Sequence, residues 1–101
     1  MKDSYSLKLD AKTNSIQLSG ELSFSTVSTV LEQSEAVFEP IAALDIDLAE
    51  IKRSDSAGLA LLVHWIRLAK KSNKNIVFHN VPSQMLAIAE ASGLADLLPI
   101  Q

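Results

Sequence analysis

The sequence predicts an α/β fold close to the border with α+β, namely a mixed β-sheet in the order β-β-α-β-α-β-α whose helices cover mainly one face. Near the start of the chain, two segments of alternating apolar and polar residues flank a group of turn formers, which predicts an antiparallel hairpin. Two later strand-like segments, 44–48 and 76–78, are each followed by a helical pattern. Such strand–helix–strand connections are right-handed and pair their strands in parallel.

The N-terminal hairpin is predicted from periodicity of two residues. Apolar and polar residues alternate over 5–9 and again over 16–19, so each strand has one buried face. The turn formers of Asp10–Asn14 lie between the two strands, and Gly20 closes the hairpin.

A helix is predicted directly after the hairpin. Ser25 or Thr26 would cap its first turn, and Pro40 marks its end. Its apolar residues recur at spacings of three, four and seven, which gives one core-facing stripe. This stripe consists of Val27, Val30, Leu31, Val37 and Phe38.

The second predicted helix runs from about residue 57 to residue 71 and has an unusually wide apolar arc. One apolar stripe faces the sheet, and a second ridge beside it consists of Leu61, Trp65 and Leu68. Two interpretations stay open: this ridge packs against a neighbouring helix, or it is partly exposed and meets another protein. The wetter face of the helix consists of Ala60, His64, Arg67 and Lys71.

The C-terminal part of the chain is predicted to add a short buried strand, 76–78, and a last helix. Ser83 would cap this helix and Gly93 would end it. The tail, Asp96–Ile100, is apolar enough to fold back onto the core.

The composition is typical of a single globular domain spanning residues 1–101. A hydrophobic content of 48% and a charged content of 21% exclude a disordered chain. The absence of cysteine excludes disulfide and thiolate chemistry. No apolar run reaches the roughly 18–20 residues that span a bilayer. Because Met1–Ser6 also lacks the apolar core of a signal peptide, we expect a cytoplasmic protein.

Charge is unevenly distributed along the chain. The net charge of −3 argues against nucleic-acid binding. However, the segment 52–74 carries +5, and the remainder carries −8. Within that segment, Lys70, Lys71 and Lys74 either lie at a helix C-terminus, where cations are favoured, or form a basic face for an acidic partner or a lipid surface.

The polar segment Arg53–Gly58 is predicted to form a strand-to-helix turn. Asp55 or Ser56 would cap the helix, and the small residues Ala57 and Gly58 leave the backbone sterically open. The helix dipole also favours an anion at this end. The turn is therefore either a helix cap or a functional site.

Catalytic interpretations of this turn find little support. A hydrolase would need Ser54 or Ser56 as a nucleophile with a histidine base. His64 is about 12 Å along the helix from Ser56, beyond hydrogen-bond reach, and His79 is interpreted as a strand-end residue. The sequence contains no glycine-rich nucleotide loop. We therefore expect a protein without enzyme activity, cofactor or small-molecule substrate.

Asp45 and Asp47 lie two residues apart on the strand 44–48. Paired carboxylates occur in acid–base and metal sites. No histidine or further carboxylate accompanies this pair at a ligand-like spacing. We expect a partly solvated strand face and no metal site.

Several segments together resemble STAS domains, which occur in anti-sigma-factor antagonists and in the tails of sulphate transporters. Leu44–Ile51 followed by Ser54–Leu59 resembles the family signature, and Gly20–Leu22 resembles its early Gly-x-Leu motif. Met85–Leu94 resembles its last helix. The resemblance covers nearly the whole chain in the predicted order. It implies a STAS-type mixed sheet and a module that binds other proteins.

Within this family, Asp55–His64 is most similar to the small stand-alone STAS subunits of phospholipid-transport systems. This similarity implies a non-catalytic accessory subunit that binds the ATPase of an ABC transporter. It would be cytoplasmic, peripheral to the inner membrane through that partner, and would serve outer-membrane lipid asymmetry.

The alternative function is that of an anti-sigma-factor antagonist, which binds an anti-sigma kinase. In that branch, the hydroxyl residue directly before the glycine is phosphorylated, and here that position is Ala57. Ser56 remains, either as a partner contact and helix cap or as a secondary phosphorylation site.

The predicted docking surface combines the turn with the outer side of the second helix. Leu61, Trp65 and Leu68 would be apolar anchors, and His64 and Arg67 would form the rim. The predicted partner-binding residues are Arg53, Ser54, Asp55, Ser56, Ala57, Gly58, Leu61, His64, Trp65 and Leu68.

Overall fold

The computed structural model describes residues 5–10, 12–13 and 15–100. Residues Met1–Ser4 of the N-terminal segment, and Ala11 and Asn14 of the predicted hairpin turn, lie outside the described residues. Within the described ranges, no helix is long and apolar enough to cross a membrane. The elements in chain order are β1 (Tyr5–Asp10), β2 (Ser15–Leu22), α1 (Phe24–Phe38), β3 (Ala43–Asp47), β4 (Ile51–Ser54), α2 (Ser56–Lys71), β5 (Asn75–His79), α3 (Ser83–Ala91) and a short 3-10 helix, η1 (Ala95–Leu97).

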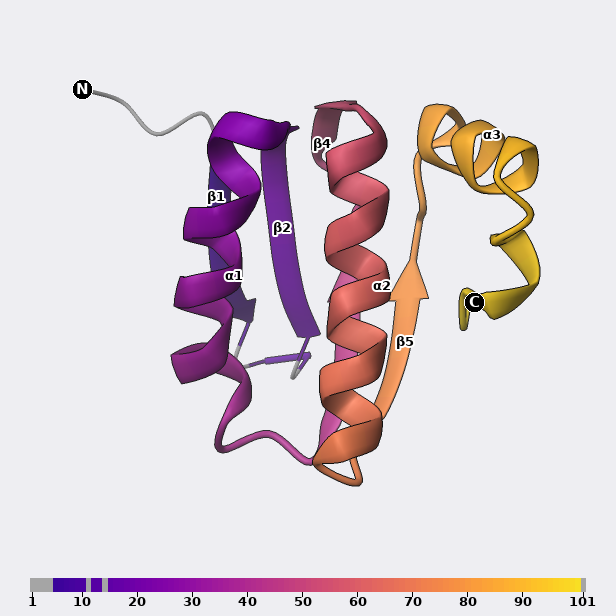
Figure 1. The fold of residues 1–101 in the computed structure, drawn as a ribbon. Helices are drawn as coiled ribbons and strands as arrows, with labels where there is room; N and C mark the ends of the chain where they lie inside the picture. The colour runs from indigo at the N-terminus through magenta and orange to yellow at the C-terminus, as the bar shows by residue number, and fades with distance from the viewer. Residues whose placement is uncertain (1–4, 11, 14, 101) are drawn as a thin grey trace.

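The sheet is mixed, as predicted. β1 and β2 form the expected antiparallel hairpin, and β2, β3 and β5 follow in parallel. The register pairs Leu9 with Ile16, Ile16 with Ile46, and Ile46 with Phe78, so these side chains share one face. Figure 1 shows this sheet behind the two long helices.

One strand was missing from the predicted order. β4 pairs in parallel with Gly20–Leu22 at the end of β2, while the start of β2 pairs with β3. Lys52 and Arg53 are exposed, and Ile51 is half-buried. The segment therefore lacks the apolar alternation that marks a strand in the sequence. Its pairing with β2 rests on backbone hydrogen bonds at the sheet edge. Because β4 pairs with Gly20–Leu22, β2 does not end at Gly20, where the hairpin was predicted to close, but continues to Leu22.

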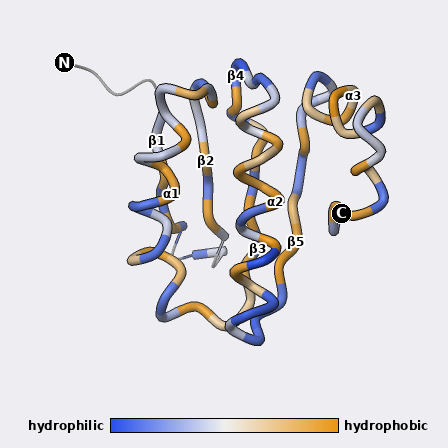
Figure 2. Tube along the Cα trace, viewed as in Figure 1, coloured by the Kyte–Doolittle hydropathy of each residue, from blue (hydrophilic) through white to orange (hydrophobic). Residues whose placement is uncertain are grey.

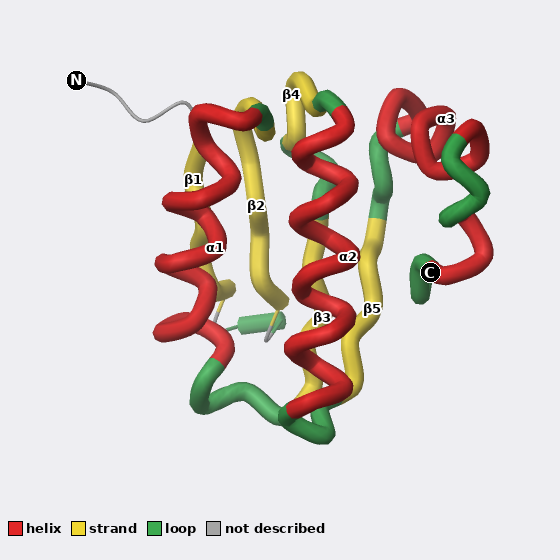
Figure 3. Tube along the Cα trace, in the orientation of Figure 1, coloured by secondary structure: helices red, strands yellow, loops and turns green. Residues whose placement is uncertain are grey.

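α1 and α2 lie side by side against one face of the sheet (Figure 3), and α3 lies beyond β5, packed beside α2 (Figure 1). Helices thus cover mainly one face, as predicted. Around α2, apolar and polar residues alternate as its amphipathic pattern requires (Figure 2). The largest fully buried apolar side chains come from both layers: Ile16, Leu18, Leu22, Val30, Ile46, Leu48, Leu62, Trp65, Phe78 and Met85.

Two predicted helix caps were wrong. α1 begins at Phe24 with Ser23 as N-cap, and the Ser23 N–H donates to Thr26 Oγ1 at 2.9 Å. Thr26 is therefore part of the first turn. α3 has Pro82 at its N-cap position, and Ser83 is already helical.

The predicted ends of two helices are confirmed. α1 stops at Phe38, just before Pro40. Gly93 has a φ of 72° and follows α3, whose last turn is closed by a 2.8 Å hydrogen bond from Leu94 N–H to the Ala89 carbonyl. The tail also folds back as predicted, because the Phe78 N–H donates to the Pro99 carbonyl at 2.8 Å.

Candidate functional site

The turn between β4 and α2 is a capped helix N-terminus. Asp55 is the N-cap, and its Oδ1 accepts a hydrogen bond from the Ala57 N–H at 2.8 Å. The Asp55 N–H donates to the Leu22 carbonyl at 3.2 Å, which fixes the turn to the end of β2. Of the two predicted caps, Asp55 is confirmed, and Ser56 is the first helical residue instead.

The six residues of this turn divide into an exposed set and a buried set. Arg53, Asp55 and Ser56 are exposed. Ser56 makes no side-chain hydrogen bond with the described part of the chain, so its hydroxyl is accessible from outside. Ser54 and Ala57 are only 6% and 5% exposed, and Gly58 is buried as well.

The second apolar ridge of α2 is largely internal, which decides between the two open interpretations. The Trp65 ring is fully buried, stacks edge-on against Phe38 at 5.2 Å, and donates its Nε1–H to Ser34 Oγ at 2.9 Å. Leu61 is also buried, and Leu68 is half-buried. The prediction that Leu61 and Trp65 are exposed anchors was therefore wrong, because α1 already covers them.

Most of the exposed residues of α2 form one stripe along its whole length, polar except for Ala60 and called the polar stripe below. Its members recur every three or four residues and span roughly 80° of the helix circumference at 100° per residue. These stripe residues are Ser56, Ala60, His64, Arg67 and Lys71, all exposed. The stripe connects the capped turn to the basic end of the helix.

A hollow of about 240 Å³ lies between the first turns of α1 and α2. It is lined mostly by apolar side chains, including Val27, Leu31, Ala57 and Leu61. Phe24 also lines this hollow, called the upper hollow below. It is 80% exposed, more than any other large apolar side chain among the described residues. The sequence prediction missed Phe24 because it began the helix two or three residues too late. Once the helix starts at Phe24, its spacing to Val27 and Leu31 places all three on one side.

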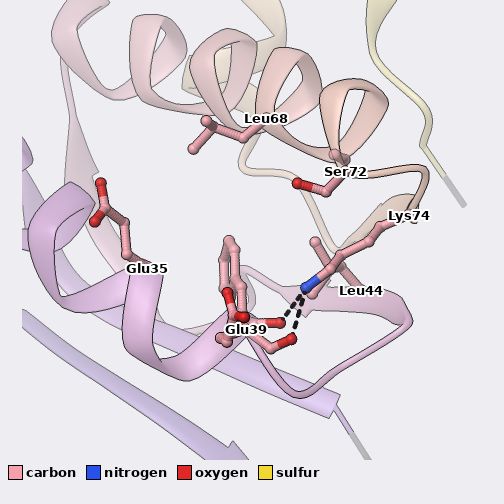
Figure 4. A pocket seen from close by; sticks show the side chains of 8 residues that line it. Glu35, Glu39, Leu44, Leu68, Ser72 and Lys74 are labelled. Atoms are coloured by element: carbon pink, nitrogen blue, oxygen red, sulfur yellow. Dashed lines mark hydrogen bonds between the residues drawn. The ribbon is translucent and has the colours of Figure 1, made fainter.

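A second hollow of about 220 Å³ lies lower between the same helices, lined by Glu35, Phe38, Leu68 and Lys74 among others. Lys74 extends across it and donates from Nζ to the Phe38 carbonyl at 2.6 Å and the Glu39 carbonyl at 3.0 Å (Figure 4). This lysine therefore caps the C-terminus of α1. Lys70 and Lys71 lie in the last turn of α2, which agrees with the interpretation that these lysines lie at a helix C-terminus.

The opposite face of the sheet carries the polar residues once considered for chemistry. His79 Nε2 lies 3.0 Å from Asp45 Oδ1, and Asp47 Oδ1 accepts from the Ala49 N–H and from Asn80 Nδ2. Side chains alternate along β5, and Phe78 is buried under the helices. His79 therefore faces away from them, on the other side of the sheet from Ser56. The structure does not bring the two together as a nucleophile and base. Among the described residues, no group of three histidine or acidic side chains could hold a metal ion.

The comparisons with known proteins agree with this architecture. Residues 6–99 match the family model described as "Mlab, STAS domain". The chain is 37% identical over 87 residues to the intermembrane phospholipid transport system binding protein MlaB of Escherichia coli, covering 85% of this chain and 88% of that protein. It is 24% identical over 98 residues to the anti-sigma-B factor antagonist of Bacillus subtilis, covering 93% and 90% of the two chains.

Solved structures share the fold at lower sequence identity. A chain of the Acinetobacter MlaFEDB complex in an ATP-bound conformation superposes with a TM-score of 0.80 at 24% identity, covering 95% of this chain and 99% of that one. The unphosphorylated anti-sigma factor antagonist SpoIIAA superposes with a TM-score of 0.70 at 20% identity, covering 95% and 88%. The chain therefore belongs to the STAS-domain family, in the group whose family model is described by the name Mlab.

Proposed function

We propose that this chain is a non-catalytic accessory subunit that binds the cytoplasmic ATPase of an inner-membrane phospholipid-transport ABC complex. The complex would maintain the lipid asymmetry of the outer membrane. The identity of 37% to E. coli MlaB, over most of both chains, supports this proposal. The observation that supports a particular binding surface is the exposed Ser56 hydroxyl at the capped N-terminus of α2.

Arg53, Asp55 and Ser56 would contact the ATPase directly, with His64 at the rim. Binding would favour one arrangement of the ATPase over others and so change its turnover. Through this partner the subunit would lie in the cytoplasm against the inner membrane. Ser54, Gly58 and Trp65 have no part in this contact, because they are buried within the fold.

Purification of the tagged chain from detergent-solubilised membranes of its own host tests the proposal. The transporter ATPase is expected among the retained proteins, identified by mass spectrometry. Ser56→Arg places a long charged side chain at the centre of the contact and should abolish retention. Gln17→Arg, on the opposite sheet face, is the matched control and should retain the ATPase.

Two outcomes would contradict different parts of the proposal. A folded Ser56→Arg variant that still retains the ATPase would show that the surface is wrong. Retention of an anti-sigma kinase by the unmodified chain, with phosphate on Ser56 in an intact mass measurement, would favour the anti-sigma-factor antagonist. Ala57 argues against this alternative, since it has no hydroxyl and its side chain is 5% exposed.

A further inference from the structure

We infer that the groove between α1 and α2, together with the polar stripe of α2, receives an amphipathic, acidic helical segment of the protein partner. This inference rests on the proposed function and extends it. An apolar side chain of that segment would enter the upper hollow beside Phe24. Its carboxylates would lie over Arg67 and Lys71.

The upper hollow has the properties of a socket for one apolar side chain. Its volume of about 240 Å³ and its mainly apolar lining suit a leucine or phenylalanine. Phe24 is 80% exposed at its edge. An aromatic side chain so exposed beside an apolar hollow is typical of a protein contact.

The hollow is continuous with the turn that the proposed function uses. Ala57 lines it one residue after Ser56, and Ala60 and His64 belong both to its lining and to the stripe. A partner that touches Ser56 therefore reaches the hollow without leaving the α2 surface. Its lower counterpart lies about 10 Å further along α2, by the rise between Leu61 and Leu68. That distance corresponds to two turns of a bound helix.

Charge indicates the chemistry of the partner. No aspartate or glutamate occurs between Ser56 and Asn80. Arg67, Lys70 and Lys71 are exposed and make no ion pair or side-chain hydrogen bond with the described residues. Glu35, across the lower hollow, is also without an ion pair within the described part of the chain. The α2 side of the groove is thus positive, and a segment with carboxylates on that side complements it.

The affinity of purified variants for the cognate ATPase subunit tests the inference. Phe24→Ser and Ala60→Gln should each weaken binding by about tenfold. Thermal midpoints should stay unchanged, because both positions are exposed. Leu97→Ser is the matched control, since Leu97 is also a large apolar residue, 59% exposed, but lies in η1 and lines neither hollow of the groove. It should bind like the unmodified chain.

Charge reversal provides the second arm. Arg67→Glu with Lys71→Glu should slow association by about tenfold at low salt. The matched control, Lys8→Glu with Lys12→Glu, should not slow it, because both lysines lie in or beside the hairpin. Equal affinity of the Phe24, Ala60 and charge-reversal variants would overturn the inference while leaving the proposed function intact. Failure of the unmodified chain to bind the ATPase would overturn both.

Two other occupants of this surface would also overturn it. One is a membrane, shown if the charge-reversal variant loses binding to phosphatidylglycerol vesicles but not to the ATPase. The other is a second copy of the chain, shown if Phe24→Ser converts a dimer into a monomer and leaves ATPase affinity unchanged.

Discussion

Gly58 is the residue that lets the first turn of α2 approach the sheet. A Cβ at this position would overlap Ser54 Oγ and come within 3.1 Å of Leu22 Cβ. Ser54 is buried and donates to the Asp55 carbonyl at 3.2 Å, so its hydroxyl cannot turn aside without losing that bond. The close contact at Gly58 thus positions both the cap, Asp55, and the exposed Ser56.

Gly58→Ala should lower the free energy of unfolding by about 1–3 kcal/mol, as expected for overpacking. This result would run against the helix propensity of alanine, which favours the substitution by about 1 kcal/mol. Urea denaturation measures the change. Combining it with Ser54→Ala removes the overlapping hydroxyl and should restore part of the loss. A stabilised Gly58→Ala protein would show that the turn is not tightly packed.

The Trp65 side chain shows the limit of periodicity in predicting a site. The spacing correctly identified a second apolar ridge on α2. Periodicity alone does not show whether such a ridge packs against a neighbouring helix or against a partner protein. Ser34 decides the matter, since its hydroxyl accepts the indole N–H inside the core. That partner lies 31 residues away in sequence, and no local pattern indicates it. Trp65→Ala would destabilise the fold and so could not report on docking.

At the scale of elements, the C-terminus of α1 is held by a residue from a distant loop. α1 has no basic residue in its own last turn, and Lys74, which follows α2, donates to two of its terminal carbonyls. The lysine therefore joins the C-terminal end of α1 to the loop that follows α2, across the lower hollow (Figure 4). Cations at a helix C-terminus also interact favourably with its dipole.

Lys74→Met should lower the free energy of unfolding by about 1–2 kcal/mol, because two carbonyls lose a charged donor. Lys71→Met is the matched control, since Lys71 is exposed and its side chain makes no hydrogen bond within the described residues. It should change stability by less than about 0.5 kcal/mol. Equal effects of the two substitutions in thermal denaturation would contradict the capping role of Lys74.

The elements that the sequence predicted correctly are those with a strong local pattern. The hairpin, α2 and the close of α3 at Gly93 follow from alternation, amphipathicity and a glycine with positive φ. β4 was missed because Lys52 and Arg53 break the alternation, and its pairing with β2 is a long-range property. Phe24 was missed because the start of α1 depends on Ser23, and helix boundaries are poorly specified by periodicity.

At the scale of the molecule, the one-sided packing of helices gives two different surfaces. The sheet face without helices carries paired polar side chains such as Asp45 with His79. The helical side carries the capped turn, the apolar upper hollow and the unpaired cations of α2. On one surface the polar side chains are paired with each other. On the other, the α2 cations lack ion-pair partners within the described residues. The second surface is the one suited to docking.

Site-specific cross-linking in native membranes tests this account most directly. Because the chain has no cysteine, Ser56→Cys introduces a unique thiol that can carry a photoactivatable cross-linker. Gln17→Cys, exposed on the opposite sheet face, carries the same reagent as a control. The account predicts that the Ser56 position cross-links to the transporter ATPase and that the Gln17 position does not. Cross-linking to the ATPase from Gln17 alone would contradict it.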